Sequence, residues 1–216
     1  MKGPRLLIVV EGAGWAFGLA GVVWWGAFQA EMASSTKDDL ERFATLRQLI
    51  QEAGTPDQTL WSPARVTAWR RAMLTATAAP VAVLRVPAIG LEVPVLPGTA
   101  SDTLDRAVGH IEGTAQPGTD GNLGLAGHRD GFFRGLKDVN VGDVIEVETT
   151  GGKDLYRVER IWVVDPGDVS VLNPTPRRTL TLVTCYPFYF VGSAPRRFIV
   201  RAVAADGPAS RVGNGS

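Results

Sequence analysis

A series of short β-type runs that begins at Val81 constrains the fold more than any other feature of this sequence. Seven runs of alternating or β-branched apolar residues follow one another, and each is bounded by Gly, Pro, Asp or Asn. They are residues 81–86, 91–96, 122–128, 143–149, 155–165, 179–185 and 196–204. No long helical pattern separates them. The sequence therefore predicts a mainly β domain over residues 80–206, built as an antiparallel sandwich or barrel.

The N-terminal part of the chain contains an apolar stretch over residues 6–30, with Glu11 as its one charge. Its length exceeds the roughly 20 residues that a helix needs to cross a bilayer. Lys2 and Arg5 precede the stretch and acidic residues follow it, so the positive-inside rule places the N-terminus in the cytoplasm and the rest outside. We expect residues 1–34 to form a single-pass membrane anchor. A cleaved signal peptide is the alternative, because small residues near position 30 are compatible with cleavage.

Residues 35–79 are expected to form a linker of two helices. A capping pattern at Thr36 precedes a stripe of apolar residues, and the Gly-Thr-Pro at 54–56 ends it. Ser62 and Pro63 then restart a helix as N-cap and first-turn proline. The linker is either a stalk or cover for the following domain, or a plain amphipathic spacer. Residues 207–216 are small and polar, and a disordered tail is expected there.

Composition excludes several classes of function. Lys plus Arg and Asp plus Glu both number 22, so no charge excess indicates a nucleic-acid partner. The chain has no nucleotide-binding glycine motif, and one cysteine with two histidines does not make a zinc site. No cofactor or metal is expected. Asp120 and Asp130 are two scattered carboxylates, and solvated loop charges explain them better than a calcium site does.

The single cysteine, Cys185, is either a small buried hydrophobe or a reactive thiol. Because side chains alternate along a strand, the apolar residues of each strand mark its core face. These residues are Leu180 and Leu182 in one strand, Leu123 and Leu125 in a second, and Phe198, Val200, Ala202 and Ala204 in a third. Cys185, His128 and Arg197 each fall on the opposite face. A structural cysteine would point inward, so this parity favours catalysis.

These three side chains support one particular chemistry. A thiolate is the competent nucleophile, and a nearby imidazole can take its proton and later protonate a leaving amine. A guanidinium can donate hydrogen bonds to the developing oxyanion. Attack on a peptide bond would give a thioester. Water would release the acyl group as a protease does, whereas an amine would complete a transpeptidation.

At this point the sequence resembles a known family, the sortases. Residues 181–185, Thr-Leu-Val-Thr-Cys, resemble the TLxTC signature of that family, and the order His, Cys, Arg is also the sortase order. Residues 126–134 resemble the segment around the sortase histidine. Residues 185–188 and 194–200 are similar to the class D branch in particular. The resemblance covers about residues 81–204.

The resemblance implies a closed barrel of about eight strands, carried outside the bacterial cytoplasmic membrane on the N-terminal anchor, with no cofactor. It implies cleavage of a C-terminal sorting signal of the LPxTG kind between Thr and Gly. The acyl group would pass to an amine of a cell-wall precursor or of another protein.

The resemblance also assigns roles, with Cys185 as nucleophile and His128 as acid/base. The third residue is Arg197 or its neighbour Arg196, and both parity and the Arg-Phe-Ile-Val spacing favour Arg197. Thr184 is either part of an oxyanion region or a β-former on the inward face. In the same way, His110 (in Gly-His-Ile-Glu-Gly-Thr) is either a groove residue or a loop histidine that bonds the backbone.

Four other functions are alternatives to this interpretation. A caspase-type protease also has His before Cys, but the residues around Cys185 lack its Q-A-C-x-G signature, and the surroundings are nearly all β. A papain-like enzyme has the opposite order. The remaining alternatives are an extracytoplasmic cysteine protease that hydrolyses the sorting signal, and a non-enzymatic β-barrel that serves as a binding module.

Overall fold

The computed structural model describes residues 55–74, 79–189 and 192–205. All of them belong to one compact unit, Leu46–Ser216. The expected anchor over residues 1–34, the first linker helix and the tail at 207–216 lie outside these residues. Within the described ranges, no helix is both long enough and apolar enough to cross a membrane.

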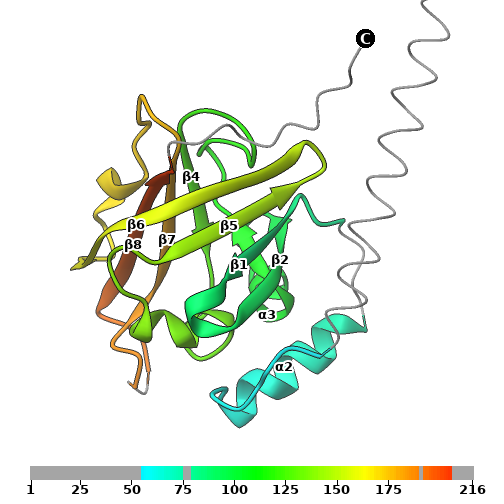
Figure 1. Cartoon of the computed structure of the whole chain (residues 1–216). Coiled ribbons are helices and arrows are strands. Elements are labelled where there is room, and N and C mark those ends of the chain that lie inside the picture. Colours follow the sequence, from blue (N-terminus) through cyan, green and yellow to red (C-terminus); the bar gives the residue numbers. More distant parts are fainter. Residues whose placement is uncertain (1–54, 75–78, 190–191, 206–216) are drawn as a thin grey trace, which may run out of the picture. The chain divides into compact units, whose positions relative to one another are not determined.

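Eight strands form a closed barrel in the order β1-β2-β3-β4-β7-β8-β6-β5 (Figure 1). Their bounds are β1 Ala82–Val86, β2 Leu91–Pro97, β3 Val108–His110, β4 Asn122–Ala126, β5 Val144–Thr149, β6 Gly152–Val164, β7 Thr179–Tyr186 and β8 Arg196–Ala204. Closure leaves no unpaired strand edge. The expected mainly β barrel of eight strands is thus confirmed, and each of the seven runs contains a strand.

Short helices connect the strands. They are α3 Ser101–Arg106 and the 3₁₀ turns η1 Pro87–Ile89, η2 Phe132–Asp138 and η3 Val169–Leu172. The β2–β3 and β4–β7 pairs are parallel, and the other pairs of the barrel are antiparallel. The expectation of an antiparallel sandwich or barrel was therefore wrong for two pairs. Helix α3 lies between β2 and β3 in the chain, and the β5–β6 hairpin lies between β4 and β7.

Strand β3 is the strand that the sequence pattern does not indicate, because it has three residues and a central glycine. Gly109 pairs with Leu96 of β2 on one side and with Ala126 of β4 on the other. A Cβ at this position would lie 2.3 Å from the carbonyl oxygen of Gly98. Only glycine allows the two backbone segments to approach this closely.

Gly109→Ala is therefore expected to lower the free energy of unfolding by about 1–3 kcal/mol, because backbone must shift to admit the methyl group. Gly167→Ala is the matched control, since a Cβ there meets nothing within 4 Å. Chemical denaturation of both variants measures the difference. Equal stability of the two variants would contradict the steric account of β3.

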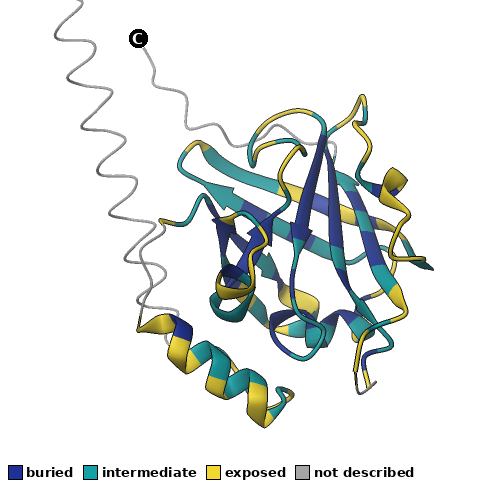
Figure 2. Ribbon diagram, turned by 180° about the vertical axis from the view of Figure 1, so that it is seen from behind, coloured by how far each residue is buried: buried dark blue, intermediate teal, exposed yellow. Residues whose placement is uncertain are grey.

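The core lies inside the barrel and is lined by the inward faces of the strands (Figure 2). Leu180 and Leu182 are fully buried there, as parity in β7 predicts. The opposite face of β7 is not simply exposed, however. Thr181 is fully buried on it and donates a hydrogen bond of 2.7 Å to Oδ1 of Asn122. The amide nitrogen of Asn122 in turn donates to backbone carbonyls of the η3 turn region, so this loop covers part of the outer face.

Helix α2, Pro63–Met73, confirms the second helix expected in the linker. Ser62 is its N-cap and accepts a hydrogen bond from the backbone N–H of Arg65. Just before the helix, the ring of Trp61 packs edge-on against Phe132 of η2, with 4.7 Å between centroids. Trp69 also packs against the barrel core. This part of the linker is a cover for the domain and not a free spacer.

Candidate active site

Strands β4 and β7 bring the two reactive residues to one end of the barrel. The strands are parallel neighbours, and their last register pair is Ala126 with Val183. His128 follows β4 by two residues, and Cys185 follows Val183 by two as the second-last residue of β7, so both lie at the same end of the two strands. Because β4 ends at Ala126, His128 belongs to the loop after it. Strand parity therefore does not set the direction of His128, and that step of the sequence argument was wrong.

Thr184 ties the two strand ends together. Its hydroxyl donates a hydrogen bond of 2.7 Å to the carbonyl oxygen of Gly127, the residue before His128. The side chain is only 2% exposed, so the bond is shielded from water. Of the two interpretations of Thr184, the structure supports the inward β-former. The hydroxyl also fixes the start of the loop that carries His128.

Strand β8 places an arginine opposite the cysteine. Cys185 and Arg197 are direct register partners in the antiparallel β7–β8 pair, whereas Arg196 is opposite Tyr186. Directly opposed residues have their Cβ atoms roughly 4.5–5.5 Å apart on one face of the sheet. Arg197 is half-buried and its guanidinium donates to the carbonyl of Ala194 at 3.3 Å, while Arg196 is exposed.

A cleft of about 790 Å³ opens beside these residues. It is lined by Leu60, Trp61, Ser62, Arg65, His128, Arg129, Asp130, Arg134, Cys185, Phe188, Tyr189, Gly192, Ser193 and Ala194. Cys185 and His128 thus share one cleft. Arg197 is not among the lining residues, although its hydrogen-bond acceptor Ala194 is. Four residues from the segment before and within α2 form one wall.

His128 lies in a charged but largely dry environment. Burial lowers its pKa most, and the positive charge of Arg65 lowers it further, while Asp105 and Asp130 oppose these effects in part. The Nε2 atom lies 3.5 Å from Oδ1 of Asp105. This separation is too long for a full hydrogen bond, so the contact is electrostatic. The net effect of these surroundings is a pKa of His128 below its ordinary value.

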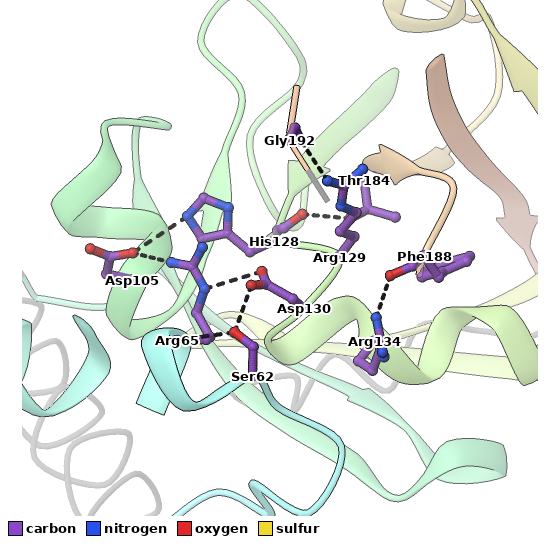
Figure 3. A network of polar contacts seen from close by, with 11 residues as sticks. Ser62, Arg65, Asp105, His128, Arg129, Asp130, Arg134, Thr184, Phe188 and Gly192 are labelled. Atoms are coloured by element: carbon purple, nitrogen blue, oxygen red, sulfur yellow. Dashed lines mark hydrogen bonds and ion pairs between the residues drawn. The ribbon is translucent and has the colours of Figure 1, made fainter. Parts of the chain in front are cut away.

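Arg65 connects helix α2 to the site (Figure 3). Its guanidinium forms an ion pair with Asp105 of α3 and a second one with Asp130, with 3.2 Å between Nε and Oδ1. Ser62 adds a hydrogen bond of 3.0 Å to the other oxygen of Asp130. Burial alone would raise the pKa of Asp130, but Arg65 and the hydrogen bonds from Ser62 and Arg65 outweigh it and lower the pKa. Asp130 is therefore a paired charge, and its description as a solvated loop residue was wrong.

Two further arginines hold the β7–β8 loop against the histidine loop. Arg129 donates to the carbonyls of Pro187 and Gly192, at 3.1 and 2.8 Å. Arg134 donates to the carbonyl of Phe188 and lies over the ring of Tyr189, 4.0 Å from its centroid. These contacts tie Pro187, Phe188, Tyr189 and Gly192 to the segment that carries His128. The sequence analysis did not single out either arginine, since a loop arginine has no pattern that identifies its acceptor.

The remaining candidates from the sequence lie away from this cleft. His110 is 5% exposed in β3, and its Nε2 lies 3.0 Å from the carbonyl of Ala115. The backbone-bonding interpretation of His110 is supported, although the residue is in a strand and not in a loop. Asp120 is an exposed loop charge that pairs with Arg178. Across the described ranges, no three His, Cys, Asp or Glu side chains are grouped so that they could hold a metal ion.

Comparison with known families decides the identity of the barrel. The model of the sortase domain matches residues 84–205, which include Cys185, His128 and Arg197. The chain belongs to the sortase family. Sortase D of Bacillus subtilis (strain 168) is 35% identical over 119 residues, which are 55% of this chain. The match spans 60% of the length of that curated relative.

Solved sortase structures share the fold. A Clostridium perfringens Sortase D5 transpeptidase superposes with a TM-score of 0.56 at 26% identity, covering 76% of this chain and 99% of that chain. Sortase A from Corynebacterium diphtheriae superposes with a TM-score of 0.57 at 28% identity, covering 82% of this chain and 93% of that chain. A lid mutant of the same sortase has a TM-score of 0.57 at 28% identity, covering 80% of this chain and 95% of that chain. The resemblance stated from the sequence motifs is thus confirmed at the level of the family.

Proposed function

We propose that this sortase is a cysteine transpeptidase in which Cys185 is the nucleophile, His128 the acid/base and Arg197 the oxyanion-stabilising residue. The observation that carries the proposal is the geometry of the β4–β7–β8 ladder. Cys185, at the end of β7, and His128, just after β4, lie at the same end of two parallel strands, and Arg197 is directly opposite Cys185. The shared cleft gives a peptide access to both the thiol and the imidazole.

The reaction would proceed in two halves. The Cys185 thiolate attacks the scissile carbonyl carbon, the C–N bond breaks, and the His128 imidazolium gives its proton to the departing amine. The guanidinium of Arg197 donates hydrogen bonds to the carbonyl oxygen as negative charge develops on it. An incoming amine then loses a proton to His128 and attacks the thioester. The C–S bond breaks, the departing Cys185 thiolate takes that proton back from His128, and a new amide and the free thiol result.

The proposed substrate is a C-terminal sorting signal of the LPxTG kind, cut between Thr and Gly. The proposed acceptor is an amine of a cell-wall precursor or of a second protein. Residues 1–34 would anchor the enzyme in the bacterial membrane with the barrel outside the cytoplasm. The motif resemblance and the family membership support these proposals.

Incubation of the full chain with a set of sorting-signal peptides, with and without amines, tests the function. Mass spectrometry is expected to detect a thioester on Cys185 and, when an amine is present, a peptide joined to that amine. Hydrolysis that amines do not divert would make the protein a protease. Failure of every peptide to react would contradict the proposal.

We further propose that the segment from Leu60 to Arg65 acts as a lid over the cleft. The segment lines one wall, and it is attached through Trp61 on Phe132 and through the ion pairs of Arg65. The Corynebacterium diphtheriae relative is described as having a lid. In this position the segment would narrow the cleft through which a peptide reaches Cys185.

Trp61→Ala should loosen the lid, because the variant loses the aromatic contact with Phe132. Alkylation of Cys185 by a bulky maleimide is then expected to accelerate about tenfold, as a loss of about 1.4 kcal/mol from the closed state predicts. Leu74→Ala, at an exposed position just after helix α2 and outside the proposed lid, is the control. Equal alkylation rates for the two variants would count against a lid.

A further inference from the structure

The Nε2 atom of His128 is buried, and among the described residues it has no hydrogen-bond partner. A buried ring nitrogen in this state is costly, and it becomes more costly when the ring is protonated and both nitrogens are donors. The acid/base role requires the protonated ring for one half of each cycle. A nearby acceptor for Nε2–H is therefore needed.

The carboxylate of Asp105 is the group placed to be that acceptor. Its Oδ1 lies 3.5 Å from Nε2, a separation that a small rotation of either side chain reduces to hydrogen-bond length (Figure 3). Asp105 is on α3, a different element from the loop that carries His128, so its position does not depend on movement of that loop. Helix α3 is held in turn by α2 contacts and by the backbone bond from Ala107 to Thr103.

None of the other charged groups described around His128 is placed to accept a hydrogen bond from Nε2–H. Asp130, in the loop of His128, already accepts from Ser62 and Arg65. Arg129, also in that loop, is a cation and can only donate hydrogen bonds. Cys185, on β7, is the group that exchanges a proton with the ring in the proposed mechanism. From α2, Arg65 places a positive charge beside the ring and forms an ion pair with the same Oδ1 atom of Asp105.

We propose that Asp105 is the positioning residue of His128, accepting Nε2–H from the imidazolium so that Nδ1 is the nitrogen that exchanges protons, and that Arg65 competes for the same carboxylate oxygen. The inference rests on the acid/base role proposed for His128. With Arg65 in place, Asp105 is shared and the ring stays neutral. With Arg65 displaced, the carboxylate is available to the ring, and the charged form of His128 is stabilised.

The test follows the protonation of His128 directly, by imidazole NMR titration of the full chain in detergent in a Cys185→Ala background. The chain has only two histidines, so His110, which is buried in β3, serves as an internal reference. Asp105→Asn is expected to lower the pKa of His128 and to leave the His110 signal unchanged. Asp105→Glu keeps the negative charge and is expected to give a pKa of His128 between those of the parent and of Asp105→Asn. Asp102→Asn, at an exposed position of the same helix, is the matched control.

The competition is tested with Arg65→Gln, which is expected to raise the pKa of His128. The rise should be smaller when Asp105→Asn is also present, because the carboxylate that Arg65 releases is then missing. Arg70→Gln, which removes an exposed charge from the same helix, is the control. An equal rise with and without Asp105 would show that Arg65 acts on the ring by its charge alone, and would overturn the competition.

Turnover provides a second readout. With Cys185 present, Asp105→Asn is expected to lower kcat/KM about tenfold and to move the alkaline limb of the pH profile to lower pH, since the imidazolium is lost sooner. An unchanged His128 titration in Asp105→Asn would overturn the inference even in an active enzyme. An inactive parent with the expected titrations would overturn only the proposed transpeptidase function. Should Asp105→Asn fail to fold, Asp105→Glu and Arg65→Gln still decide the outcome through the same titration.

Discussion

Cys185→Ala is expected to abolish thioester formation and transfer, with turnover reduced by at least about 10⁴-fold, as for other nucleophiles that act as part of a unit. The physical reason is that no other thiol exists in the chain, so no other residue can form a thioester. Mass spectrometry of the enzyme with a sorting-signal peptide measures the adduct, and product formation measures the transfer.

The structural control for this variant is its thermal unfolding. The Cys185 side chain is free and only half-buried, so its replacement is expected to change stability little. A folded Cys185→Ala protein that still joins peptide to amine would contradict the assignment of the nucleophile. A Cys185→Ala protein that binds peptide without converting it would instead support that assignment.

Arg197→Ala is expected to lower kcat by about 10²–10³-fold, the usual cost of removing one oxyanion donor. Arg197→Lys should restore little, because an ammonium group lacks the planar fork of a guanidinium. The matched control is the neighbouring Arg196→Ala, an exposed position opposite Tyr186, where a change of about twofold or less is expected. Steady-state kinetics of the three variants make the comparison.

The opposite order of effects would move the catalytic role from Arg197 to Arg196. In this structure Nη1 of Arg197 donates to the carbonyls of Ala194 and Arg196 at 3.3 and 3.1 Å. The proposed bond to the oxyanion is an interaction of the transition state. Arg197→Ala is therefore expected to act on kcat more than on KM. A pure rise in KM would indicate substrate binding without oxyanion stabilisation.

The barrel could be predicted from the sequence because most of its strands carry their own signal. Runs such as 179–185 and 196–204 combine β-branched residues with period-two alternation, and they correspond to β7 and β8 almost residue for residue. Strand β3 carries no such signal. It exists because Gly109 admits a close backbone approach, and that approach is a property of the folded neighbour Gly98 and not of the local sequence.

The candidate site also contains residues that the sequence pattern predicts and residues that it does not. Cys185 and Arg197 were correctly placed on one face, because both lie within regular strands where parity holds. His128 lies in a loop, and only the motif resemblance identified it. The pairing of Arg65 with Asp105 and Asp130 joins positions 40 and 65 residues apart in the chain, and no sequence period relates a linker helix to a loop of the barrel.

The β6–β8 register also determines where the barrel can be modified. Val164 pairs with Arg197 near the cleft, while Tyr156 pairs with Ala204 at the far end of β8. The β5–β6 hairpin, which turns between Thr149 and Gly152, therefore lies at the end of the barrel remote from the thiol. A fluorophore or an affinity tag inserted in this hairpin would leave the mouth of the cleft unobstructed. The enzyme could thus be immobilised in one orientation, with the reactive end facing the solution.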